Sequence, residues 1–207
     1  SIDEAKLLSS YIKGLLPLTE FWEAFKGRVS EGFDPEIHLK RIGVINQTTM
    51  LAEETGELAA IIRSALIEKV GGEEDSIAVS DIFADTRDTL CYATSENQSA
   101  VHELLKEEAS IAVVIGGFNS SNTTHLAAIC QRRFPTFHVR RADDIVSLDS
   151  VICRDIVSGV EISKSLIEYL PKDPTLPIRV ALTAGASTPD AVVEAVIEKI
   201  GMIVQNL

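Results

Sequence analysis

The spacing of hydrophobic residues predicts two helices at the start of the chain. The run from Ser1 to Glu4 is a capping-box pattern, and apolar residues at helical spacing continue from it until Gly14. Thr19 is a candidate N-cap for a second helix that ends near Gly32. This second helix carries aromatic residues at helical spacing, and we expect them in a hydrophobic core: Phe21, Trp22 and Phe25.

Further along, one pattern occurs three times: a short β-branched strand, a polar loop rich in Ser, Thr and Asn, and an amphipathic helix. The strands are predicted at 41–45, 111–115 and 179–182, the loops at 46–49, 116–122 and 183–188, and the helices at 50–70, 123–133 and 189–200. Pro189 is expected at the first position of the last helix. Such alternation predicts an α/β fold class of parallel-sheet α/β/α lobes.

The pattern is interrupted by the acidic, glycine-containing stretch GGEED at 71–75, and we expect a domain boundary within 72–85. Residues 1–80 are then predicted to form part of one α/β lobe. Residues 85–207 are predicted to form a complete α/β lobe, which begins with a further helix over 94–106.

Composition and charge restrict the possible partners of this 207-residue chain. Lys and Arg number 19 against 31 Asp and Glu, a formal net charge of −12, which argues against a nucleic-acid interface or an anionic membrane surface. The apolar run 111–118 is far shorter than the ~18 to 20 residues of a membrane helix. No secretory signal is recognisable, and the absence of an initial Met suggests a trimmed or partial chain.

The three polar loops are candidates for binding an anion. In an open α/β sheet, ligands bind beyond the carboxyl ends of the strands, where loops lead into helices. There the free N–H groups of a helix start and nearby hydroxyls favour negative charge. Gly116 and Gly117 allow close backbone approach to a ligand. The alternative is ordinary helix capping by the same residue types, and neither the dinucleotide nor the P-loop glycine motif is present.

The three cysteines differ in their sequence surroundings. Cys91 directly precedes a predicted helix, and a helix N-terminus lowers the pKa of a thiol, which makes Cys91 a candidate metal ligand or nucleophile. Cys130 and Cys153 lie among apolar residues and are expected to be small buried side chains. The odd number of cysteines favours a reducing compartment over a disulfide framework. The spacings between the three match no zinc or ferredoxin pattern. For the four histidines a surface or packing role is expected: His38, His102, His125 and His138.

Four motifs together resemble one enzyme family. They are NQTTM at 46–50, DTLCYAT at 88–94 with Gln98, GGFNSSNTTHL at 116–126, and TAGASTPD at 183–190. In this order and spacing they are similar to the carboxyl-terminal part of 4-hydroxy-3-methylbut-2-enyl diphosphate reductase, the LytB/IspH family. The stretch GFDP at 32–35 resembles the longer variety found in cyanobacteria and plastids.

The resemblance implies an oxidoreductase of isoprenoid biosynthesis, built as a three-lobed, trefoil-like enzyme. A [4Fe–4S] cluster held by three cysteines would remove the substrate hydroxyl with two electrons and protons, giving isopentenyl and dimethylallyl diphosphate. By resemblance, Cys91 is the third cluster cysteine. Thr48 matches a catalytic threonine beside the substrate hydroxyl, in the proton-delivery network, and Thr49 its substrate-binding neighbour. The diphosphate-binding positions are matched by Ser120, Ser121, Asn122 and Ser187.

The other two cluster cysteines of the family belong to an amino-terminal region that is not part of this sequence, and Cys130 and Cys153 do not match them. We therefore expect the chain alone to be free of cluster and inactive. The alternatives are a non-catalytic α/β module that binds a phosphorylated metabolite and a purely structural fragment whose loops only cap helices. The resemblance further implies a ferredoxin or flavodoxin as electron donor, and the bacterial cytoplasm or a plastid as location.

Overall fold

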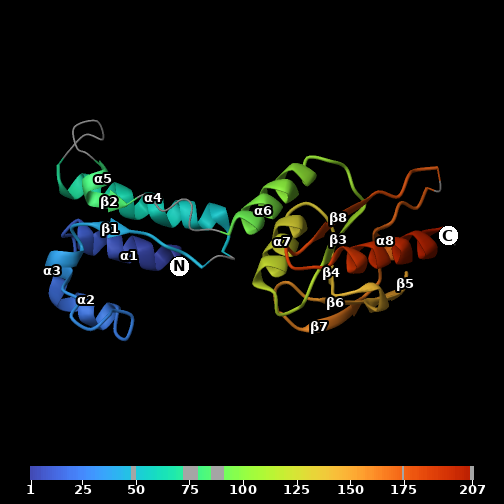
Figure 1. The fold of residues 1–207 in the computed structure, drawn as a ribbon, viewed down its shortest axis with the longest axis horizontal. Coiled ribbons are helices and arrows are strands. Elements are labelled where there is room, and N and C mark those ends of the chain that lie inside the picture. Colours follow the sequence, from blue (N-terminus) through green and yellow to red (C-terminus); the bar gives the residue numbers. More distant parts are fainter. Residues whose placement is uncertain (48–49, 72–78, 85–90, 174, 206–207) are drawn as a thin grey trace. The chain divides into compact units, whose positions relative to one another are not determined.

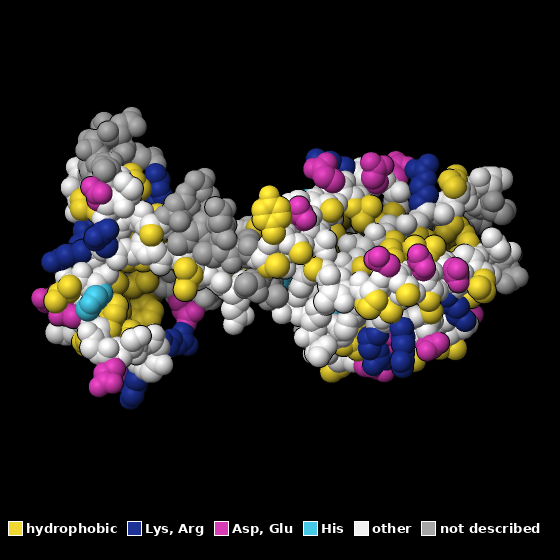
Figure 2. Space-filling model, viewed as in Figure 1, with side chains coloured by type: hydrophobic (Ala, Val, Ile, Leu, Met, Phe, Trp, Pro, Cys, Tyr) yellow, Lys and Arg dark blue, Asp and Glu magenta, His cyan; other side chains and the backbone are white. Residues whose placement is uncertain are grey.

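The computed structural model describes residues 1–47, 50–71, 79–84, 91–173 and 175–205. The chain divides into two compact units, Ser1–Leu90 and Cys91–Leu207, each described below by itself (Figure 1). The second unit thus starts at Cys91, whereas the sequence analysis placed the start of the second domain at residue 85. Within the described residues, no helix is long and apolar enough to cross a membrane. On the face shown in Figure 2, Lys and Arg side chains lie among Asp and Glu and form no broad basic surface.

The first unit is mostly helical and contains one small parallel strand pair. Its helices are α1 (Ile2–Ile12), α2 (Leu18–Ala24), α3 (Pro35–His38), α4 (Ala52–Lys69) and α5 (Val79–Ile82), and its strands are β1 (Ile42–Gly43) and β2 (Phe83–Ala84). The helices α1 and α4 pack against each other. Their buried residues, among them Ile12, Ile62 and Leu66, share a hydrophobic core with Phe21.

The predicted start of α1 is confirmed, but the second helix is shorter than predicted. The hydroxyl of Ser1 accepts the backbone N–H of Glu4, while the Glu4 side chain bonds back to the N-cap residue, which completes the capping box. Helix α2 begins after Pro17 and ends at Ala24, so Thr19 is not its cap. Phe21 is buried as predicted, whereas the core prediction was wrong for Trp22, which is 47% exposed.

The second unit contains a six-stranded sheet with helices on both faces. Its elements are α6 (Tyr92–Leu104), β3 (Ile111–Ile115), α7 (Ser121–Gln131), β4 (Thr136–Val139), β5 (Ile145–Ser147), β6 (Ser150–Arg154), β7 (Glu161–Lys164), β8 (Val180–Ala184) and α8 (Asp190–Val204). Two short 3-10 turns lie at Ala142–Asp144 and Ile167–Tyr169. The α/β class is therefore confirmed.

The prediction of a parallel sheet is confirmed for the two predicted strands, β3 and β8, but the whole sheet is mixed. The strand order is β5-β6-β4-β3-β8, with β7 paired to β6. Only the pairs β3–β4 and β3–β8 are parallel, whereas β4–β6, β5–β6 and β6–β7 are antiparallel. The cause is local: β5 ends at Ser147 and β6 begins at Ser150, and so short a connection can join only antiparallel strands.

The buried centre of the sheet is β3, whose five residues are all buried. Alternate residues of a strand point to opposite faces. Ile111, Val113 and Ile115 belong to the core cluster that includes Val196 and Ile200 of α8. The helix α7 contacts β3 and β4, and Figure 1 shows the strands between α7 and α8.

The register of the parallel strands brings two loops together. Ile115 at the end of β3 is paired with Val139 of β4 and with Ala184 of β8. The carbonyl of Ile115 accepts the N–H of Gly185 at 2.9 Å and the hydroxyl of Thr188 at 3.1 Å. The β3–α7 loop, residues 116–120, and the β8–α8 loop, residues 185–189, therefore start side by side at one edge of the sheet.

The side chain of Thr123 fills the space between these two loops. A Cβ atom added at Gly185 would lie 2.3 Å from Thr123 Oγ1, and one added at Gly116 would lie 2.5 Å from the same atom. Thr123 is only 1% exposed, so it has little room to move away. Both positions therefore require glycine for close packing.

The first prediction concerns this packing. We expect Gly185→Ala to lower the free energy of unfolding of the second unit by about 1–3 kcal/mol, because the added methyl group overpacks against Thr123. Adding Thr123→Ala should recover part of that loss. Urea titration followed through the amide NMR signals of β3 measures both effects. Gly201→Ala in α8 is the control: a Cβ there meets nothing within 4 Å, and equal destabilisation by both alanine variants would contradict this account.

Candidate functional site

The predicted anion-binding residues of the β3–α7 loop lie at the start of α7. Ser120 is the N-cap residue, and its hydroxyl oxygen accepts the N–H of Thr123 at 3.3 Å and the Thr123 hydroxyl at 3.0 Å. Because both of these groups donate to Ser120, the hydroxyl proton of Ser120 is available for a further acceptor. Ser121 is exposed, whereas Asn122 is buried. The buried Asn122 Oδ1 atom, an acceptor, has no hydrogen-bond partner in the described part of the chain.

The backbone of this loop requires glycine at position 116. Gly116 has φ +155°, a conformation that other residues rarely adopt. The carbonyl of Gly117 accepts the N–H of Ser120 at 2.9 Å, which closes a turn before the helix. A Cβ atom at Gly117 would lie 2.9 Å from Oδ1 of Asn119. The loop therefore passes close to its own side chains and leads directly into α7.

The β8–α8 loop contributes Ser187, which is exposed. Its neighbour Thr188 is tied to the end of β3 through the carbonyl of Ile115. Pro189 is the N-cap residue of α8 and not, as predicted, its first helical residue. Ser120 and Ser187 thus belong to two loops that start at adjacent strand ends.

Cys91 occupies the predicted position at a helix start, although α6 begins earlier than the predicted residue 94. It is the N-cap residue of α6 and is exposed. The backbone N–H groups of Thr94 and Ala93 and the hydroxyl of Thr94 stabilise its thiolate and lower its pKa below the ordinary value of 9.0. The side-chain amide of Asn97 donates to the carbonyl of Ala184 at 3.1 Å, which fixes α6 to the carboxyl end of β8.

The other two cysteines are buried, as predicted. Cys130 lies in α7 and Cys153 in β6, and both are free thiols. Burial raises the pKa of Cys130 to about 11 and also raises the pKa of Cys153. Neither thiol is therefore suited to bind metal as a thiolate.

A metal cluster needs further ligands besides Cys91. Among the described residues, no group of three or more His, Cys, Asp and Glu side chains could hold a metal ion. A four-iron cluster requires several thiolates, and Cys91 is one. The described residues of this chain therefore do not fit such a cluster by themselves. The predicted Thr48 and Thr49 lie outside the described residues.

The sequence analysis did not select two residues that contact the β3–α7 loop. His138 of β4 is fully buried, and its Nε2 donates to the carbonyl of Gly116 at 3.1 Å. Arg154 of β6 donates from a guanidinium nitrogen to the carbonyl of Phe118. They are cross-strand partners in the β4–β6 pair. Their contact with the loop follows from their places in β4 and β6. Because these two strands were not predicted, no sequence pattern indicated this contact.

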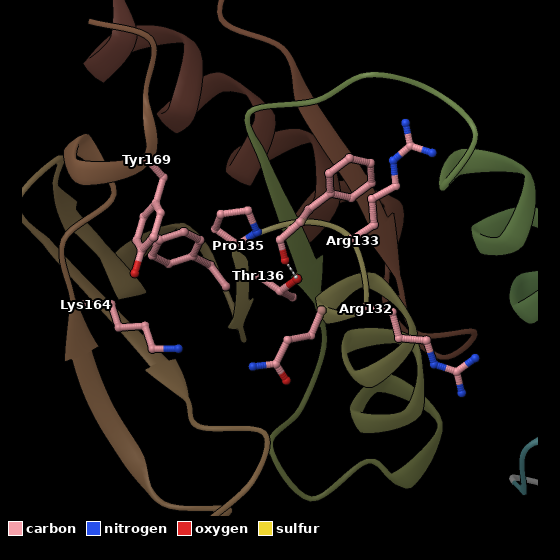
Figure 3. A pocket seen from close by; sticks show the side chains of 9 residues that line it. Arg132, Arg133, Pro135, Thr136, Lys164 and Tyr169 are labelled. Carbon is pink, nitrogen blue, oxygen red and sulfur yellow. Dashed lines mark hydrogen bonds between the residues drawn. The ribbon is translucent and has the colours of Figure 1, made fainter.

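A pocket of about 320 Å³ lies elsewhere in this unit, at the carboxyl end of α7. Its lining includes Arg132, Arg133, Lys164 and Tyr169. Figure 3 shows Arg132 and Arg133 pointing away from Lys164, so the cationic groups do not converge on one ligand position. Because Ser120 caps the opposite end of α7, this pocket is separate from the candidate site.

Comparison with known proteins identifies the family. The model of the family described as LytB protein matches residues 19–201. The chain belongs to the LytB family. A LytB relative from Prochlorococcus marinus (strain MIT 9515), a 4-hydroxy-3-methylbut-2-enyl diphosphate reductase, is 41% identical over 206 residues, which cover 99% of this chain and 49% of the relative. A relative of the same name from Microcystis aeruginosa is 40% identical over 97% of this chain and 47% of its own length.

This LytB chain spans about half the length of the curated relatives it matches. A solved structure of (E)-4-hydroxy-3-methyl-but-2-enyl diphosphate reductase is 23% identical, with a TM-score of 0.43. The match covers 96% of this chain and 65% of that one. The cyanobacterial relatives agree with the expected longer variety of the family.

The second prediction concerns the thiols of this LytB chain. At pH 7.5, iodoacetamide should alkylate Cys91 in the native protein and leave Cys130 and Cys153 unmodified. The pKa of Cys91 is lowered and its side chain is exposed, whereas burial raises the pKa of the other two. Peptide mass spectrometry identifies the modified sites, and unfolding in urea should expose all three. Rapid modification of Cys130 in the native protein would contradict the structure.

Proposed function

We propose that this chain is the carboxyl-terminal portion of a 4-hydroxy-3-methylbut-2-enyl diphosphate reductase. In the longer protein the reaction would remove the substrate hydroxyl reductively and yield isopentenyl and dimethylallyl diphosphate. The observation that carries the proposal is the pairing of β3 with β8, which starts the Ser120 loop and the Ser187 loop side by side in a LytB chain. The curated relatives, which are about twice as long as this chain, bear the name of that enzyme.

The proposed task of the two loops is to hold the diphosphate end of the substrate. Ser120 has a hydroxyl proton to donate, because its oxygen already accepts two hydrogen bonds from Thr123. Ser121, Asn122 and Ser187 complete the donor set that we assign to the diphosphate. The N–H groups at the start of α7 add a positive dipole end. Fixing the diphosphate in this way would position the hydroxyl end of a short substrate.

The proposed task of Cys91 is to supply one thiolate to an iron–sulfur cluster. Its lowered pKa and its exposure suit a metal ligand. Since the described residues of this chain offer no further thiolate with these properties, the remaining ligands would have to come from elsewhere in the longer protein. Thr48 as the catalytic residue of proton delivery and Thr49 as a substrate contact stay predictions. A ferredoxin or flavodoxin as electron donor belongs to the same proposal.

A second candidate function is anion binding without redox chemistry. It is favoured by one observation. Both loops proposed for the diphosphate lie within this chain, whereas the described residues provide one exposed cysteine, too few for a cluster. The substitution Cys91→Ala distinguishes the two functions. Pyrophosphate binding should survive Cys91→Ala under either function, whereas the reductase activity of a full-length protein should be lost only if Cys91 holds the cluster.

The third prediction tests the diphosphate loops. Pyrophosphate should raise the melting temperature of this chain, and Ser187→Ala should weaken its binding about tenfold, the equivalent of ~1.4 kcal/mol, because one donor is lost. Isothermal titration calorimetry at constant ionic strength measures the affinity. Ser99→Ala, an exposed serine within α6, is the matched control and should leave binding unchanged. If pyrophosphate binds neither the native chain nor the control, the loops serve only as caps and the proposal fails.

The fourth prediction concerns the cluster. Anaerobic incubation of this chain with iron and sulfide should give no stable brown protein after gel filtration, because one thiolate cannot hold a four-iron cluster. Iron analysis and visible absorption measure the outcome. A stable chromophore that disappears in Cys91→Ala would show that this chain assembles a cluster without the remainder of the longer protein.

A further inference from the structure

The carbonyl groups of the β3–α7 loop are held from the sheet side by two residues. His138 donates to the carbonyl of Gly116 and Arg154 donates to the carbonyl of Phe118. The two donors are directly opposite each other on antiparallel strands, so their side chains lie on the same face of the sheet. The loop backbone is thus fastened at two alternate peptide groups.

The ring of Phe118 reinforces this attachment. It packs edge to face with His138, with the ring centroids 5.2 Å apart. The guanidinium carbon of Arg140 lies over the Phe118 ring, 4.2 Å from its centroid, in a cation–π contact. Arg140 is itself held by Asp144 through hydrogen bonds of 3.0 and 3.1 Å. The side chains under the loop therefore form one connected group.

The direction of these carbonyls determines the direction of the next N–H groups. In a trans peptide group the C=O and the N–H point in opposite directions, and no described peptide bond is cis. With the Gly116 and Phe118 carbonyls directed toward His138 and Arg154, the N–H groups of Gly117 and Asn119 point away from them. Gly117 and Asn119 are exposed, and neither N–H donates a hydrogen bond within the described residues.

We propose that His138 and Arg154 are positioning residues that turn the N–H groups of Gly117 and Asn119 toward the phosphate oxygens of the ligand. This inference rests on the proposed diphosphate site and adds the residues that orient its backbone. Two N–H groups that share one direction can donate to the same anion, which needs no cationic side chain. The structure gives His138 a donor role only at Nε2, since its Nδ1 has no partner in the described residues.

The imidazole performs this role in its neutral form. Burial lowers the pKa of His138. The hydrogen bond to the carbonyl of Gly116 raises this pKa, and the positive charge of Arg154 lowers it. A neutral ring with its proton on Nε2 can donate to the carbonyl without adding charge. The glutamine side chain also carries an N–H donor at a similar reach, whereas methionine fills the space without one.

The fifth prediction compares four variants of this chain in pyrophosphate binding. His138→Met and Arg154→Met should each weaken binding about tenfold, because a released carbonyl lets its peptide group rotate. His138→Gln should bind within about threefold of the native chain, because it keeps the donor. Arg133→Met removes the same charge as Arg154→Met, but at the far end of α7, and should bind within about twofold. Calorimetry at one ionic strength measures all of them.

Amide NMR provides the readout that a structural role alone would not change. In the native chain, pyrophosphate should shift the amide protons of Gly117 and Asn119, and these shifts should be smaller in Arg154→Met. If the native chain binds pyrophosphate and Arg154→Met binds equally well with the same shifts, this inference is wrong and the proposed function stands. If the native chain does not bind, the proposed function fails as well. Should His138→Met fail to fold, the comparison of Arg154→Met with Arg133→Met decides alone.

Discussion

The parallel pairing of β3 with β8 is the constraint on which the candidate site depends. The pair aligns Ile115 with Ala184, and the carbonyl of Ile115 then accepts hydrogen bonds from both Gly185 and Thr188. A slip of one residue would turn every side chain of β8 to the opposite face. Because β3 is buried along its whole length, such a slip would place its partner's apolar side chains out of the core. The hydrophobic core therefore fixes the relative position of Ser120 and Ser187.

The site also shows how an acidic protein can offer a place for an anion. The chain has a formal net charge of −12, so a site for a diphosphate has to compensate an unfavourable long-range field. In the proposed site, the groups around the β3–α7 loop would do this at short range, through hydroxyl and N–H dipoles fixed by packing. Arg154 and Arg140 lie behind the loop and contact Phe118, which places positive charge near the donors without a direct path to the ligand. Fixed dipoles of this kind need little reorganisation when a ligand binds.

The sequence predicted the parts of the fold that depend on local pattern. The strand 111–115, the helices that follow the three loops and the position of Cys91 all follow from periodicity and capping, which act over a few residues. The antiparallel strands β5, β6 and β7 were missed because they are short and part-exposed, so their patterns are weak. His138 and Arg154 could not be selected for a different reason: their roles exist only once β4 and β6 are paired. The apolar pattern does not mark the helix end at Ala24, because the aromatic spacing continues beyond it.

The two proposed functions of the chain lie in one compact unit, and this has a consequence for the chemistry. Cys91 and both loops belong to the unit Cys91–Leu207. Asn97 holds α6 to the end of β8, and Cys91 precedes Asn97 by a helical rise of roughly 9 Å. The separation between the thiolate and the diphosphate loops is therefore set by packing within this unit, whatever the position of the rest of the protein. In the proposed site, a substrate held at its diphosphate would extend toward Cys91, the proposed metal ligand, over a distance that this unit fixes. Under the proposed function, such an arrangement would select substrates by length, since a longer or shorter chain would carry its hydroxyl past or short of the metal.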